Sequence, residues 1–219
     1  MPKNAFFSLP GKKQDDFFDL ALDVFAQQPY HQASLSSLLK NAGIPKGTFY
    51  QYFSDKLDLY DHLVSNVFTM KQFYLKSRMP QHTDDFYRYF ETLLRLETGF
   101  RLQHPAFHSL IAFASDPRLS PFSQDRIREM TEQHQQMLHT MLVRNQLKGS
   151  VVSDADAAMV TFCCQLLLDE FHHFVRQRIQ KEKISPDKAS GDDHTDWIAD
   201  SSRQFMKLFR RSLSVQKTR

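Results

Sequence analysis

Apolar residues recur every three to four positions along almost the whole chain, and this helical spacing most constrains how it can fold. Only 6 glycines and 9 prolines interrupt the 219 residues, and no stretch alternates as strands do. The pattern predicts an all-α protein, with short helices in the first part of the chain and longer ones after it. We expect two domains, residues 1–56 and 57–219.

The smaller domain is predicted to hold three short helices. They are expected at residues 13–28, 35–42 and 45–52. Pro29 ends the first helix, and Ser34 offers an N-cap to the second. Gly43 stands directly after the second helix, where a left-handed C-cap favours glycine. Residues 1–11 show no helical period and are predicted to form a flexible arm.

The larger domain is predicted to be a bundle of long helices, because the apolar stripes extend over more turns. They are expected at residues 55–77, 84–103, 105–114, 120–146, 154–181 and 193–213. Proline or glycine marks most of the breaks between them. Neither repeats nor low-complexity segments interrupt this pattern.

Charge and cysteine usage exclude several classes of protein. The net charge of +3 is far too small for a polycationic binder. The two cysteines, Cys163 and Cys164, are adjacent, which suits neither a disulfide framework nor zinc spacing. The N-terminus lacks a signal-peptide pattern, and the longest apolar stretch, residues 157–168, is too short to cross a bilayer. We expect a cytoplasmic protein with no membrane segment.

Two short helices joined by a tight glycine turn, with a supporting helix before them, form a helix-turn-helix. Its second helix fits the major groove of DNA. Residues 17–59 read FFDLALDVFAQQPYHQASLSSLLKNAGIPKGTFYQYFSDKLDL. This stretch resembles the N-terminal domain of the TetR family of transcriptional regulators, chiefly through ALDVFAQQPY and AGIPKGTFYQYFSDKLDL. It departs from the family at Gln28-Pro29-Tyr30 and Leu38-Leu39-Lys40, outside the groove-facing set.

The resemblance implies which residues hold DNA. These are Ser34, Lys46, Gly47, Thr48, Tyr50, Gln51, Tyr52 and Lys56. Lys46 can reach a guanine edge or a phosphate, and Gln51 can pair with adenine. A glycine at position 47 allows close approach of the backbone. The phenols of Tyr50 and Tyr52 can bind phosphate.

Each of these residues also has a purely structural interpretation. Ser34 can be a simple N-cap, and Thr48 can satisfy its own helix turn. Lys46 and Gln51 can be ordinary solvated side chains. Lys56, in the first turn of a helix, opposes the helix dipole unless a phosphate lies nearby. Phe49 and Phe53, together with Ile44, are predicted to fill the small core and to make no DNA contact.

The sequence contains little that indicates an enzyme or a metal site. The sequence has no Gly-rich phosphate loop, nucleophile elbow or dinucleotide fingerprint. Glu170 and His173 form a Glu-x-x-His pair, but a di-iron bundle needs two such pairs and two further glutamates. We expect no enzymatic activity, no metal and no cofactor.

An effector site is expected in the larger domain, because 20 phenylalanines and 8 methionines suit an adaptable apolar pocket. The candidate lining residues are Phe90, Phe107, Phe113, His134, Met137, Phe162, Leu166, Glu170 and His173. A core histidine satisfied by its neighbours is the alternative for His134 and His173.

The resemblance also implies a homodimer paired through the last two long helices, 154–181 and 193–213. Such a dimer would present two reading helices to a palindromic double-stranded operator. A hydrophobic small molecule would then release it from DNA, most simply as a repressor. A helical-bundle enzyme and a protein-binding adaptor are the alternatives.

Overall fold

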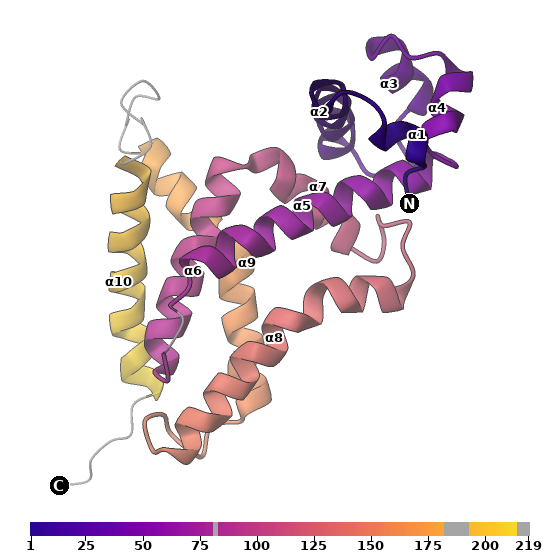
Figure 1. Ribbon diagram of the computed structural model, residues 1–219. Coiled ribbons are helices and arrows are strands. Elements are labelled where there is room, and N and C mark those ends of the chain that lie inside the picture. The colour runs from indigo at the N-terminus through magenta and orange to yellow at the C-terminus, as the bar shows by residue number, and fades with distance from the viewer. Residues whose placement is uncertain (81–82, 182–192, 214–219) are drawn as a thin grey trace, which may run out of the picture. The chain divides into compact units, whose positions relative to one another are not determined.

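The computed structural model describes residues 1–80, 83–181 and 193–213, without the side chains of residues 133, 134 and 193–195. This described part contains helices and no strand, so the predicted all-α fold is confirmed (Figure 1). None of its helices is long and apolar enough to span a membrane. The helices are α1 (Asn4–Phe7), α2 (Gly11–Gln27), α3 (Leu35–Asn41), α4 (Lys46–Tyr52), α5 (Lys56–Arg78), α6 (Phe86–Gln103), α7 (Pro105–Ser115), α8 (Gln124–Leu147), α9 (Ala157–Lys181) and α10 (Asp193–Leu213).

The chain forms two compact units. Unit 1 comprises Met1–Phe73 and His104–Met130, and unit 2 comprises the described residues of Tyr74–Gln103 and Thr131–Arg219. Unit 1 is thus built from two separate stretches of sequence. The expected boundary at residue 56 does not coincide with the division between these units, and it stays a prediction.

Unit 1 is organised around α2. The buried residues of this helix, among them Ala21 and Phe25, share one face because they are four positions apart. α2 packs against α3 on one side and against α7 on another. Leu110 and Ala114 of α7 are fully buried in the same apolar cluster. The supporting helix of the helix-turn-helix is therefore held by a helix that lies about eighty residues further along the chain.

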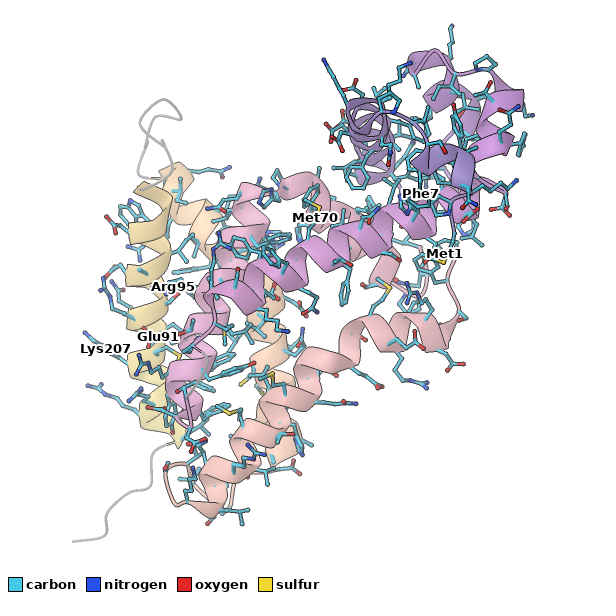
Figure 2. All side chains as sticks on the ribbon, viewed as in Figure 1. Met1, Phe7, Met70, Glu91, Arg95 and Lys207 are labelled. Atoms are coloured by element: carbon cyan, nitrogen blue, oxygen red, sulfur yellow. The ribbon has the colours of Figure 1, made fainter. Side chains whose placement is uncertain are left out.

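The N-terminal residues are ordered, and the prediction of a flexible arm is wrong. Residues 4–7 form the short helix α1, which contacts α4 (Figure 1). The Phe6 ring is only 4% exposed. Figure 2 shows the next residue, Phe7, beside the first turns of α5, and its ring centroid lies 6.3 Å from that of His62. A stretch this short carries no period, so only contacts with distant residues order it.

Unit 2 is organised around α6, which contacts both α9 and α10. Phe90, Leu93 and Leu94 of α6 are almost completely buried. Arg101, near the end of α6, crosses to α9, where its guanidinium donates to the carbonyl oxygen and the carboxylate of Asp169 at 2.8 and 2.9 Å. The same guanidinium lies 3.6 Å from the Glu97 carboxylate. An ion-pair group centred on the buried guanidinium of Arg101 thus joins α6 to α9.

Candidate nucleic-acid interface

The turn between α3 and α4 has the geometry that the sequence predicts. The Ser34 hydroxyl accepts a hydrogen bond from the backbone N–H of Ser37 at 3.2 Å, so its role as N-cap of α3 is confirmed. Gly43 adopts a φ of 65°, a left-handed conformation that side chains with a Cβ disfavour. The Ile44 N–H then donates to the Leu39 carbonyl at 3.0 Å. These bonds fix where α4 begins.

The short helix α4 presents different chemistry on its different faces. Phe49 is fully buried, together with Phe53 just beyond the helix end, which confirms their predicted place in the core. On the opposite face Lys46, Gly47, Tyr50 and Gln51 are exposed. Their spacing of i, i+1, i+4 and i+5 places them on one side of the helix. This side combines a cation, a phenol, an amide and an open stretch of backbone.

Thr48 and Tyr52 lie on a third side of α4 and are half-buried. They border a hollow of about 390 Å³, which Phe6 and Leu9 line from the N-terminal segment. The Tyr52 ring lies 6.0 Å from the Phe6 ring. The predicted DNA contacts are therefore divided between an exposed face and a side turned toward residues 6 and 9.

Lys56 is held by the protein itself. Its ammonium group donates to the carbonyl oxygen of Tyr30 at 2.5 Å and lies 4.2 Å from the centroid of the Tyr30 ring. Partial burial lowers the pKa of this ammonium group. The unfavourable position at the start of α5 is thus offset by a local partner, without any phosphate.

The candidate effector residues are divided between the two units, and their role stays a prediction. Phe107 packs against the core of unit 1, whereas Phe90 lies in the core of unit 2. Phe113 is half-buried on α7, and Met137 is exposed on α8. His134 lies outside the described side chains.

The four candidates on α9 occupy its exposed face. Phe162 and Leu166 are 57% and 49% exposed, and Glu170 and His173 are exposed beside them. The opposite face of α9 packs into the core of unit 2 through Cys164, Leu168, Phe171 and Val175. Apolar residues lie on both faces, so periodicity does not distinguish the inner face from the outer one.

No three His, Cys, Asp or Glu side chains gather as metal ligands among the residues that the structure describes. Burial raises the pKa of the Cys164 thiol to about 12, and the neighbouring Cys163 adds to this effect. A thiol with so high a pKa is a poor nucleophile at neutral pH.

Comparison with known proteins agrees with this geometry. The family model described as "Bacterial regulatory proteins, tetR family" matches residues 17–63. Residues 17–63 are a TetR-family domain. The matched segment runs from α2 into α5 and contains the glycine turn and the exposed face of α4.

Similar proteins extend the TetR likeness beyond this segment. An uncharacterized HTH-type transcriptional regulator of Bacillus subtilis, YvdT, is 32% identical over 83 residues, which are 37% of this chain and 42% of that protein. This chain thus matches less than half the length of that relative. A TetR family transcriptional regulator from Chloroflexus aurantiacus has a crystal structure with a TM-score of 0.83 at 24% identity, covering 99% of this chain and all of that one.

A third similar protein is FadR from Bacillus subtilis, solved in complex with stearoyl-CoA. It aligns with a TM-score of 0.61 at 16% identity and covers 88% of this chain and 96% of that one. At such identities the two crystal structures show a shared fold alone. The fold of these two proteins therefore extends over nearly the whole chain, although the family model matches only residues 17–63.

Two residues outside the matched segment were missed by the sequence analysis. Lys3 and Phe6 both contact the end of α4. Their positions carry no local signal, because residues 1–11 have neither a helical period nor a family motif. Only the folded chain brings them to the end of α4.

Proposed function

We propose that this protein is a DNA-binding transcription regulator, most simply a cytoplasmic repressor that binds a palindromic operator as a homodimer. The observation that supports the proposal is that α4 has one buried face and one exposed polar face. Its buried face anchors the helix through Phe49, while Lys46, Tyr50 and Gln51 are exposed together on the other face. Such a face can donate to phosphates and to base edges.

A random-sequence duplex pool tests this proposal. We expect the purified protein to enrich an inverted repeat whose half-sites are about one helical turn apart. The Gln51→Ala variant should weaken binding to the selected duplex by about 1–3 kcal/mol and relax the preference at one base pair. Gln136→Ala, at an exposed position of α8, is the matched control. Salt-sensitive retention without any enriched sequence would contradict the proposal.

The homodimer is proposed to form through the exposed side of α9 together with α10. Met159, Phe162 and Leu166 expose a continuous apolar stripe on α9, and Leu208 is exposed on α10. Apolar surface of this kind is typical of subunit interfaces. Pairing through this stripe would cover Phe162 and Leu166, which are also candidate effector-lining residues.

A charge placed in this stripe tests the dimer. Phe162→Glu should convert the dimer into a monomer at micromolar concentration, measured by analytical ultracentrifugation. Leu147→Glu, at an exposed apolar position at the end of α8, should leave the dimer intact. A wild-type chain that sediments as a monomer would rule out the dimer without affecting the DNA-binding face.

The effector is proposed to be a hydrophobic small molecule with a long acyl chain. The phenylalanine- and methionine-rich composition supports an apolar ligand, and the similarly folded FadR carries stearoyl-CoA. Stearoyl-CoA should lower the affinity for the selected duplex, whereas free coenzyme A should not. Equal effects of the two compounds would exclude the acyl chain as the recognised part.

A further inference from the structure

The recognition helix α4 is short and needs partners at its C-terminal end. It has seven residues, and helices of this length are marginal on their own. The last four carbonyl groups of any helix lack partners within the helix. In α4 the Phe49 carbonyl is satisfied by the N–H of Phe53 at 2.9 Å. The carbonyls of Tyr50 and Tyr52 need other donors.

Lys3 supplies both of these donors. Its backbone N–H donates to the Tyr52 carbonyl at 2.8 Å, and its ammonium group donates to the Tyr50 carbonyl at 2.8 Å. A cation at the C-terminus of a helix also complements the helix dipole. One residue from the start of the chain thus caps the helix that carries the candidate DNA contacts.

Phe6 anchors the capping segment. Its ring is buried, with its centroid 5.0 Å from that of Phe53, 6.2 Å from that of Phe17 and 6.0 Å from that of Tyr52. These rings belong to the core beneath α4 and to the side of α4 itself. Lys3 is therefore held in place by packing, and α1 runs beside α4 (Figure 1).

We propose that Lys3 and Phe6 are positioning residues for DNA recognition, which hold the C-terminal end of α4 in its reading orientation without touching DNA. Both lie outside the TetR-matched segment 17–63. The proposal rests on the proposed DNA-binding function. This role is distinct from a direct contact between Lys3 and DNA, because the Lys3 ammonium group donates to the Tyr50 carbonyl of the protein itself.

Hydrogen exchange in the free protein tests the capping without any DNA. Lys3→Met removes the ammonium group but keeps an unbranched apolar side chain. It should speed exchange of the backbone amides of residues 50–53 by about three- to tenfold, the effect of losing a charged helix cap. Lys3→Arg should restore slow exchange, since a guanidinium can donate to the same carbonyl. Lys12→Met, at an exposed position in the first turn of α2, removes an equal charge and should change nothing at residues 50–53.

Binding to the duplex selected from the random pool then separates positioning from direct contact. Lys3→Met should lower affinity by about three- to tenfold at every salt concentration and leave binding to unrelated duplexes almost unchanged. A direct phosphate contact would instead reduce the slope of log Kd against log salt by about 0.9. The proposal would be overturned if Lys3→Met left the exchange rates of residues 50–53 unchanged. It would also be overturned if this variant bound the selected duplex with unchanged affinity or with a reduced salt slope. If the pool yields no operator, the proposed function fails, and the exchange experiment still decides whether Lys3 caps α4.

Discussion

The ammonium group of Lys56 lies above the Tyr30 ring, 4.2 Å from its centroid, and donates a hydrogen bond to the Tyr30 carbonyl. These contacts join the first turn of α5 to the loop after α2. The family resemblance assigns Lys56 to DNA, whereas the structure gives its charge a partner within the protein. The two roles predict different behaviour in solution.

Replacing Lys56 should affect stability more than DNA binding. Lys56→Met loses a charge-assisted hydrogen bond and a cation–π contact, which together contribute about 1 kcal/mol at a partly exposed site. Urea denaturation should show this loss, while the salt dependence of DNA binding stays unchanged. Lys46→Met is the comparison, because an exposed contact with phosphate should reduce the salt slope by about 0.9. A reduced slope for Lys56→Met would restore its assignment to DNA.

Two glycines of the helix-turn-helix should respond to alanine in opposite ways. An added Cβ meets no atom within 4 Å at Gly43 or at Gly47, so crowding plays no part. Gly43→Ala should cost about 1 kcal/mol of stability, because its φ of 65° disfavours a side chain.

Gly47→Ala lies within α4 and should stabilise the protein by about 0.5–1 kcal/mol. It should nevertheless weaken binding to the selected duplex, because its methyl group would stand on the face proposed to approach DNA. Thermal unfolding and binding isotherms of both variants provide the measurements. Unweakened binding by Gly47→Ala would mean that the backbone at this position does not approach the duplex.

The ion-pair group of unit 2 should be sensitive to the loss of Arg101. Its side chain is 10% exposed and that of Glu97 is 5% exposed. Arg101→Met leaves the Glu97 carboxylate buried without this guanidinium, which should cost about 3 kcal/mol. Arg203→Met removes an exposed arginine that lies 3.9 Å from Asp200 and should cost less than about 0.5 kcal/mol. Similar urea midpoints for the two variants would show that the buried group contributes little.

His172 should make unit 2 less stable in mild acid. Burial lowers its pKa to about 4, and the nearby charges of Arg101, His173 and Arg176 act in the same direction. Below pH about 6.5 the His172 ring is protonated in the unfolded chain, whereas in the folded chain it stays neutral until the pH approaches about 4. Stability should therefore fall between pH about 6.5 and about 4, by up to about 3 kcal/mol.

The difference between the wild type and His172→Gln isolates this contribution from that of the carboxylates. The free energy of unfolding of His172→Gln should depend less steeply on pH over this range. His31→Gln, at an exposed position of unit 1, should follow the wild type. Parallel pH profiles for the wild type and His172→Gln would place the acid sensitivity elsewhere.

Local patterns were enough to predict most helices. The helix expected at 35–42 is observed at Leu35–Asn41, and the one expected at 193–213 is Asp193–Leu213. Ser34 before α3 and Gly43 after it also allowed both ends of this helix to be predicted. These features depend on neighbours within one or two turns, which is the range over which sequence patterns are informative.

Features that depend on distant contacts could not be predicted. The order of residues 3–6 arises from contacts with Tyr50, Tyr52 and Phe53, nearly fifty positions away. The outward face of α9 also carries apolar side chains, among them Phe162 and Leu166, so periodicity alone could not decide which face of α9 is buried. The exposed set on α4 was predicted from the family resemblance, and its contacts with DNA stay a prediction.

The discontinuous build of unit 1 bears on its folding during synthesis. Its first stretch ends at Phe73, but Leu110, Ala114 and Met130 of the same core emerge only with the second stretch. At about 5–20 residues per second, a ribosome needs about 3–11 s to make the residues between 73 and 130. During this interval the nascent first stretch of unit 1 exposes the apolar surface of α2 that α7 later covers. Chaperone binding to ribosome-bound chains should therefore peak before residue 130 is made, although the family domain itself ends much earlier.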